Sequence, residues 1–129
     1  MKKLFLLGLL GVMLAGCVSA PTITDNGHPG QIKAIVFYDA NRNGKLDSGE
    51  TGPQTRVAIS QDVSCPPQND QSITWTATDT NGVALIKDLK PGKYCVFPDG
   101  NYSATTPLTV DVYLSSDQEV LVVFGEVKE

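Results

Sequence analysis

The stretch that decides the architecture of this chain is residues 35–53, Ile-Val-Phe-Tyr-Asp-Ala-Asn-Arg-Asn-Gly-Lys-Leu-Asp-Ser-Gly-Glu-Thr-Gly-Pro. Its central twelve residues, 39–50, fit the pattern D-x-[DN]-x-[DN]-G-x5-E, in which oxygen atoms at fixed positions surround a calcium ion. Gly44 stands where the loop must turn sharply. The sequence therefore predicts a structural calcium ion as cofactor, with these ligands: Asp39, Asn41, Asn43, the backbone carbonyl of Lys45, Asp47 and Glu50.

The residues on both sides of the loop exclude a helix–loop–helix calcium switch. A β-branched and aromatic run, Ile35–Tyr38, enters the loop, and Pro53 follows it closely. The first favours a strand, and the composition around Pro53 predicts no helix closely behind it. A polar turn between two strands, without a metal, is the alternative interpretation. Arg42 and Lys45 lower the negative charge of the loop, so we expect weak calcium binding, with Kd about 10⁻⁴–10⁻³ M.

Short apolar runs separated by turn residues continue from residue 31 to the end of the chain. No segment after Cys17 shows a convincing 3.6-residue period. Seven short runs of this kind, spaced about 10–20 residues apart, predict an all-β fold, an antiparallel β-sandwich. The expected strands are Gln31–Tyr38, Arg56–Gln61, Ser72–Thr78, Val83–Leu89, Lys93–Pro98, Pro107–Leu114 and Glu119–Val127.

Three details of this sandwich can be predicted from local pattern. The Asn81-Gly82 turn predicts that the third and fourth strands pair as a hairpin. Trp75 alternates with its polar neighbours and is expected in the core, on the same face as Ile73 and Ala77. The uninterrupted apolar run 120–124 is expected to be covered on both faces or to lie at the centre of a sheet.

The first sixteen residues have the plan of an export signal. Two lysines precede an apolar run that is too short to cross a bilayer comfortably, and small residues follow it. Leu14-Ala15-Gly16-Cys17 resembles the lipobox of bacterial lipoproteins, which implies that Cys17 is acylated and becomes the first mature residue. Val18, rather than Asp, follows the cysteine, and the sorting rule of enterobacteria then favours the outer membrane. We expect a signal peptide at 1–16, a lipidated flexible tether at 17–30 and one domain at 31–129.

Cys65 and Cys95 remain after the lipidated cysteine. An even pair in an oxidising compartment predicts a structural disulfide. A metal site would need further soft ligands, and a redox centre would favour Cys-x-x-Cys.

Charge and composition narrow the function. The chain has 129 residues, a formal net charge of −4 and one histidine, His28. The acidic balance argues against a nucleic acid as partner, and a single histidine excludes any mechanism that needs two. Three aspartates, Asp79, Asp88 and Asp99, are the best candidates for catalysis, but each sits in an apparent turn without a nucleophile–base pair. The sequence therefore predicts a protein that is not an enzyme.

The calcium loop and two later elements resemble the SdrD B-like domain family. The residues are Val36–Glu50, Thr78-Asp79-Thr80-Asn81-Gly82 and Leu89-Lys90-Pro91-Gly92-Lys93-Tyr94. These domains are similar to collagen-adhesin B-type and transthyretin-like (prealbumin-like, Ig-like) folds. The resemblance implies a seven-stranded Greek-key sandwich of the kind that forms calcium-stiffened stalks in surface adhesins. The chain departs from that pattern in its single domain, its expected lipid anchor and its cysteine pair.

The expected function follows from these parts. It is a non-enzymatic, calcium-binding lipoprotein of the cell envelope, an adhesion, binding or structural module displayed from the outer membrane. Its expected partners are the membrane, through the lipid on Cys17, and an unidentified envelope or extracellular protein or glycan. The alternative is a carbohydrate-binding or hydrolase-inhibitor lipoprotein, with rings such as Trp75, Tyr94, Tyr102 and Tyr113 as a sugar platform.

Overall fold

The computed structural model describes residues 21–61, 64–68, 72–100 and 103–128. The predictions for the signal peptide, Cys17 and Tyr102 lie outside these residues. The fold is all-β, as predicted, and no α-helix occurs among the described residues. The seven strands are β1 (Gly30–Tyr38), β2 (Arg56–Ser60), β3 (Ile73–Ala77), β4 (Val83–Leu89), β5 (Gly92–Pro98), β6 (Val110–Leu114) and β7 (Glu119–Glu126).

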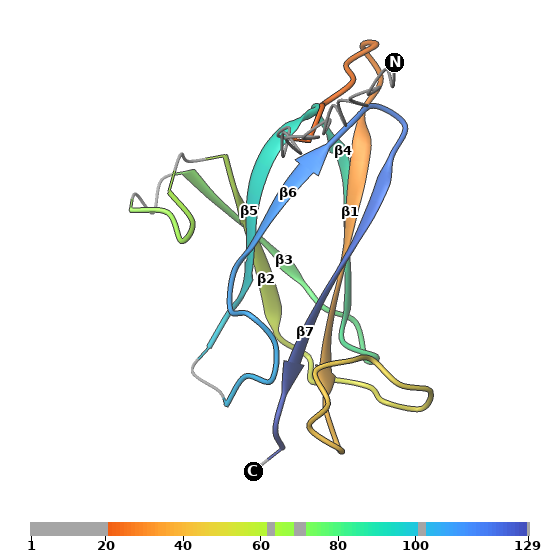
Figure 1. Cartoon of the computed structure of the whole chain (residues 1–129), viewed down its shortest axis with the longest axis vertical. Coiled ribbons are helices and arrows are strands. Elements are labelled where there is room, and N and C mark those ends of the chain that lie inside the picture. Colours follow the sequence, from red (N-terminus) through yellow and green to blue (C-terminus); the bar gives the residue numbers. More distant parts are fainter. Residues whose placement is uncertain (1–20, 62–63, 69–71, 101–102, 129) are drawn as a thin grey trace, which may run out of the picture.

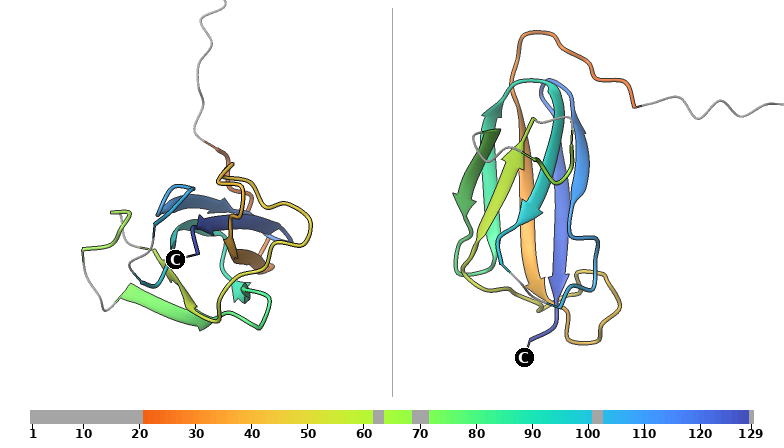
Figure 2. Two further views of the ribbon diagram at one scale, coloured as in Figure 1. Left: turned by 90° about the horizontal axis from the view of Figure 1, so that it is seen from below. Right: turned by 90° about the vertical axis from the view of Figure 1, so that its left-hand side faces the viewer.

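The strands form two sheets packed face to face as an Ig-like sandwich (Figures 1 and 2). One sheet has the order β4–β1–β7 and the other β3–β2–β5–β6. All neighbouring pairs are antiparallel except β1 and β7, which run parallel over the eight residue pairs from Gln31–Glu119 to Tyr38–Glu126. The two strands can pair in this way because most of the domain connects them.

The core fills the space between the two sheets. Alternate residues of β1 point inward, and the same alternation places β-branched and aliphatic side chains of the facing sheet opposite them. At about 25 cal/mol per Å² of apolar surface, their burial is the main force that holds the sheets together. The buried cluster is Ile32, Ala34, Val36, Val57, Ile59, Ala84, Ile86, Tyr94, Val96, Val112, Leu114, Val122 and Phe124.

The hairpin predicted for the third and fourth strands is wrong. β3 pairs with β2, and β4 pairs with β1 in the other sheet, so residues 78–82 cross between the sheets. The Asp79 carboxylate accepts N–H bonds from Asn81 and Val83 at 2.8 and 3.0 Å, and the Gly82 carbonyl accepts one from Val36 at 2.9 Å. Residues 78–82 have the sequence of a hairpin turn but connect the two sheets, because Gly82 at their end accepts a hydrogen bond from β1.

The placement of the last strand also differs from the prediction. β1 is the centre of the three-stranded sheet, and β7 is one of its edges. Leu121 of β7 is 57% exposed, and Leu85 of β4 is 40% exposed. Both lie beside Lys33 of β1 on the outer face of this sheet. The continuous apolar run of β7 thus supplies one buried face and one partly exposed face.

Trp75 is not in the core, contrary to the prediction. It lies on the outer face of the four-stranded sheet and is 39% exposed. Trp75 pairs with the small Ala58 on β2, and Ala58 pairs on its other side with Phe97 of β5. The Trp75 and Phe97 rings meet edge to face at 5.8 Å between centroids. The alternation of β3 is as predicted, but the large ring occupies the outer side.

The predicted disulfide is present. The sulfur atoms of Cys65 and Cys95 are 2.00 Å apart, and their Cα atoms are 5.4 Å apart. Cys95 is 1% exposed and lies on β5, between its partners Ser60 of β2 and Asp111 of β6. The bond therefore attaches the loop between β2 and β3 to the middle of the four-stranded sheet.

The described part of the tether is bound to the domain instead of running free. The backbone of Thr24 exchanges hydrogen bonds with Ser115 Oγ (3.0 Å) and the N–H of Ser116 (2.9 Å). Asn26 and His28 both contact the Asp117 carboxylate, at 3.2 and 3.1 Å. Residues 24–29 thus lie against the β6–β7 turn (Figure 1). None of the described residues belongs to a helix with the length and hydropathy needed to cross a membrane.

Candidate metal site

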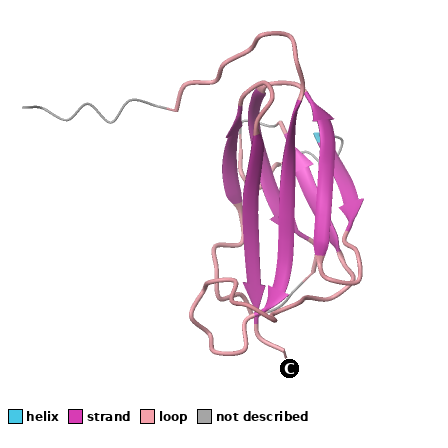
Figure 3. Cartoon of the chain, turned by 90° about the vertical axis from the view of Figure 1, so that its right-hand side faces the viewer, coloured by secondary structure: helices cyan, strands magenta, loops and turns pink. Residues whose placement is uncertain are grey.

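The predicted calcium loop connects β1 to β2 at the end of the sandwich opposite the tether (Figure 2). Both ends of the loop are fixed to the fold. The Asp39 N–H donates to the carbonyl of Glu126 on β7 at 2.8 Å, and the Tyr38 N–H donates to the carbonyl of Thr51 at 3.0 Å. The strands span the length of the domain and leave the loops at its two ends (Figure 3).

The exit of the loop is held by a close backbone crossing. A Cβ atom on Gly52 would stand 1.7 Å from the Val36 carbonyl oxygen, and one on Gly82 would stand 2.1 Å from the same atom. Gly82 also has a φ of +80°. Only glycine fits at these positions, so the loop exit and the 78–82 turn pack directly on the backbone of β1.

Asp39 occupies the first ligand position and is 2% exposed. Its carboxylate accepts N–H bonds from Asn43 at 3.1 Å and Gly44 at 2.7 Å, so the loop curls around it. Burial raises the pKa of Asp39, but the Thr105 hydroxyl and neighbouring backbone N–H groups outweigh burial and leave the pKa below its usual value. The carboxylate is therefore ionised at neutral pH, as a calcium ligand must be.

The third, fifth and ninth positions of the loop converge. The side-chain Nδ2 atoms of Asn41 and Asn43 both donate to Oδ2 of Asp47, at 2.9 and 2.8 Å. The Oδ1 atoms of the two asparagines accept N–H bonds two residues further along the chain, at 3.2 and 2.8 Å. Two amide donors thus supply the partial positive charge that a cation would supply at the Asp47 carboxylate.

Glu50 closes the loop from its last position. Its two carboxylate oxygens accept N–H bonds from Ala40 at 3.0 Å and Asp47 at 2.9 Å. Lys45 is positioned by its own N–H, which donates to Asn43. All six predicted ligand residues therefore belong to one hydrogen-bonded loop, in which Asp39 is buried, Glu50 is half-buried and the remaining four are exposed.

The residues present fit a calcium ion. The donor set is carboxylate, amide and carbonyl oxygen, which hard cations prefer. Among the described residues, no group of three or more His, Cys, Asp or Glu side chains stands close enough to hold a metal by itself. Binding would therefore depend on the asparagine oxygens and a backbone carbonyl as well as on the three carboxylates.

Residues 103–106 pack on this loop, and no pattern in the sequence predicted their role. Ala104 forms a bridge with Glu126, and the N–H groups of Thr105 and Val127 donate to Gly125 and Ser103 at 2.9 Å each. The segment thereby extends the edge of β7 beside Gly125, where a Cβ atom would meet both the Thr105 hydroxyl and the ring of the fully buried Phe37. Its sequence, Ser-Ala-Thr-Thr, resembles that of any polar loop.

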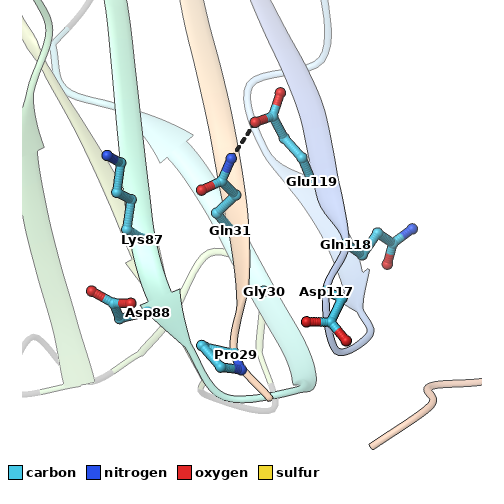
Figure 4. Close-up of a pocket in the computed structure, with 8 residues that line it drawn as sticks. All are labelled: Pro29, Gly30, Gln31, Lys87, Asp88, Asp117, Gln118 and Glu119. Carbon is cyan, nitrogen blue, oxygen red and sulfur yellow. Dashed lines mark hydrogen bonds between the residues drawn. The ribbon is translucent and has the colours of Figure 1, made fainter. Parts of the chain in front are cut away.

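The other candidates from the sequence do not form a catalytic group. Asp79 caps its own turn, and Asp99 forms an ion pair with Arg56. Asp88 is exposed at the other end of the domain, beside a hollow of about 220 Å³. Figure 4 shows that hollow, where Gln31 donates to Glu119. Asp117 also lines the hollow, and its hydrogen bonds with Asn26 and His28 lower its pKa.

The exposed face of the four-stranded sheet carries a second group of side chains. The Arg56 guanidinium lies 4.8 Å from the centroid of the Trp75 ring and also binds Asp99 through Nε at 2.9 Å. Arg56, Trp75 and Asp99 are all partly exposed. Of the other predicted platform rings, Tyr94 is buried and donates to the Lys90 carbonyl at 2.6 Å. Tyr113 is half-buried and stacks with Lys93.

The chain is similar to known proteins in sequence and in fold. A stretch of 64 residues is 41% identical to colossin-B of Dictyostelium discoideum and spans 47% of this chain but only 2% of colossin-B. The major pilin BcpA of Bacillus cereus superposes with a TM-score of 0.54 at 16% identity, over 78% of this chain and 30% of the pilin. The major pilin SpaD of Corynebacterium diphtheriae gives 0.51 at 13% identity, over 77% and 32%.

These structural neighbours are similar to the chain in fold, and the chain spans about a third of their length. The family model of the SdrD B-like domain matches residues 30–123, which run from the start of β1 into β7 and include the whole calcium-type loop. The chain is a member of the SdrD B-like domain family.

Proposed function

We propose that this protein is a calcium-binding module of the cell envelope, held to the outer membrane by a lipid on Cys17, with a structural or adhesive role and no enzymatic activity. The observation that carries the proposal is the loop 39–50, in which all predicted ligand positions are linked by hydrogen bonds at one end of the sandwich. Membership of the SdrD B-like family and the fold shared with two pilins support a structural or adhesive role at the cell surface.

The polarity of the domain supports display away from a membrane. The bound part of the tether lies at the β6–β7 turn, where β1 begins, and the calcium-type loop lies where β1 ends. A nine-residue strand is about 30 Å long at 3.3 Å per residue. An anchor at Cys17 would therefore leave the loop and the end of β7 on the far side of the domain.

Calcium should stabilise the domain without building it, because the ligand side chains lie outside the core. At a few millimolar calcium and a Kd of about 10⁻⁴ M, the free energy of unfolding should rise by roughly 2 kcal/mol. For a domain of this size, the melting temperature should then rise by about 8–16 °C. Magnesium should do less, because it requires a tight octahedral shell and loses its waters reluctantly.

Three variants test the ligand assignment by calorimetric titration and thermal melting of metal-stripped protein. Asp47→Asn and Glu50→Gln should each abolish the calcium-induced shift and leave the metal-free melting temperature close to that of the parent. Ser48→Ala is the matched control, since Ser48 is an exposed loop residue outside the ligand set. A parent protein that shows neither heat of binding nor a melting shift would reduce the loop to a polar turn.

The lipid anchor has its own test. Cys17→Ser should leave the protein uncleaved or release it from the outer-membrane fraction, and metabolic labelling with a fatty acid should mark the parent but not the variant. A variant that matures and fractionates like the parent would refute the lipid anchor, and the calcium proposal would stand.

Carbohydrate binding is a second candidate, and the exposed Trp75 ring favours it. Sugar rings stack on aromatic faces, and a sugar would take the place of the Arg56 guanidinium over the Trp75 ring. Arg56 and Asp99 would then offer a donor and an acceptor for vicinal hydroxyl groups. Trp75 is the single tryptophan of the chain, so its fluorescence reports on this face directly. Titration with envelope glycans should change its emission, and Arg56→Ala should weaken the change. Unchanged emission at saturating glycan would remove this candidate.

A further inference from the structure

Thr105 carries a buried hydroxyl that the fold leaves without a partner. Among the buried side-chain oxygen and nitrogen atoms of the described residues, Thr105 Oγ1 is the one that has no hydrogen-bond partner. A buried hydroxyl without a well-formed hydrogen bond is unfavourable, because its hydrogen bonds to water have not been fully replaced. Such an atom calls for an explanation beyond packing.

The surroundings of Thr105 place this hydroxyl at the calcium-type loop. The Thr105 N–H donates to the Gly125 carbonyl of β7 at 2.9 Å. A Cβ atom on Gly125 would stand 2.3 Å from the Thr105 hydroxyl oxygen, so the glycine leaves the space that the hydroxyl occupies. The Thr105 carbonyl faces the loop at Gly44, where a Cβ would come within 3.1 Å of it. Thr105 therefore lies between β7 and the loop.

Asp39 lies next to Thr105 on both sides: its N–H donates to Glu126, the neighbour of Gly125, and its carboxylate accepts the N–H of Gly44, which the Thr105 carbonyl faces. The Thr105 hydroxyl is also one of the groups that lower the pKa of Asp39, although it forms no hydrogen bond of normal geometry. The two well-formed bonds to the Asp39 side chain come from the N–H groups of Asn43 and Gly44, which belong to the loop itself. Thr105 thus approaches Asp39 from a separate segment of the chain, which is hydrogen-bonded to the edge strand β7.

We propose that Thr105 is a positioning residue for the calcium site: its hydroxyl donates to the Asp39 carboxylate and orients it as a ligand when the ion binds. This inference rests on the proposed calcium binding. Hydrogen-bond partners of metal-ligating side chains orient those side chains and tune the strength of binding. The contact also connects the ion to β7, because the Thr105 backbone is bound to that strand.

The test compares Thr105→Val, which removes the hydroxyl at nearly constant volume, with Thr105→Ser, which keeps it. Calcium affinity is measured by calorimetric titration of the metal-stripped chain. Thr105→Val should bind calcium about 10-fold or more weakly, in the range typical of lost outer partners. Thr105→Ser should stay close to the parent. Thr74→Val makes the same chemical change at an exposed position on β3 and should leave the affinity unchanged.

Melting without calcium separates positioning from a merely structural role. Thr105→Val removes a buried hydroxyl that forms no hydrogen bond of normal geometry, so the metal-free melting temperature should stay close to that of the parent. The variant should lose stability only in the presence of calcium. Equal affinities of Thr105→Val and the parent would overturn the inference and leave the calcium proposal intact. A drop in metal-free stability that is as large as the drop with calcium would also overturn it. A parent protein that does not bind calcium would overturn both.

Discussion

Removal of the disulfide should destabilise this domain by a predictable amount. Cys65 and Cys95 are separated by 30 positions, and the segment they close contains β3, β4 and the first part of β5. The loop-entropy relation gives about 3–4 kcal/mol for a loop of this size, because the bond restricts the unfolded chain. At about 4–8 °C per kcal/mol for a small domain, the double variant Cys65→Ala/Cys95→Ala should melt roughly 12–30 °C lower than the parent.

The assay is thermal and guanidinium unfolding of the oxidised parent, the reduced parent and the double variant. The variant should retain the sandwich, because single domains typically have 5–15 kcal/mol of stability and both sheets keep their core residues. The reduced parent should match the variant, which separates loss of the bond from loss of the sulfur atoms. A decrease in melting temperature below about 5 °C would refute the entropic argument. It would mean that the unfolded chain is already restricted near these residues.

Three further predictions follow from the described contacts. Burial raises the pKa of Glu126 above its ordinary 4.5, so Glu126→Gln should raise the melting temperature at pH 7. This advantage should be lost as the pH falls through the raised pKa toward 4.5, below which the folded and unfolded states are both protonated; a constant difference across pH would contradict this. Gly82→Ala should lower the free energy of unfolding by more than about 2 kcal/mol. Gly27→Ala, at a similar φ but with open space around it, should lower it by only about 1–2 kcal/mol. Equal losses would exclude the backbone crossing as the cause. Arg56→Ala should increase acrylamide quenching of Trp75 and cost about 0.5–1 kcal/mol, and unchanged quenching would show that the guanidinium does not cover the ring.

Local pattern was sufficient for the strands and for the loop. Two of these signals are local: the alternation of apolar residues in Gln31–Tyr38, and the many Asp, Asn and Gly residues in 39–50. They are local because strand pleat and loop curvature depend on neighbouring residues. The cysteine pair was predictable from chemistry, since the disulfide followed from an even number of cysteines and the expected oxidising compartment. These features needed no knowledge of which strands are neighbours.

The errors came from long-range pairing. Asn81-Gly82 has the residues of a hairpin turn, yet Gly82 bonds to β1 and sends the chain to the other sheet. Trp75 alternates correctly, but alternation does not say which face is inside, and Ala58 and Phe97 provide a support for the ring on the outside. Thr105 became a candidate only when the fold brought it to Asp39, sixty-six positions away in the sequence. Such contacts depend on the packing of whole sheets.

The parallel pairing of β1 and β7 has a mechanical consequence. The chain enters β1 at one end of the domain and leaves β7 at the other, and the two strands share eight residue pairs in register. A pulling force applied between the start of β1 and the end of β7 would act along the strands and load all the hydrogen bonds of this ladder together. An antiparallel hairpin pulled from its two open ends would instead break one bond after another. The calcium-type loop and residues 103–106 are attached at the end where the force leaves β7, so they would oppose the first sliding step between the two strands.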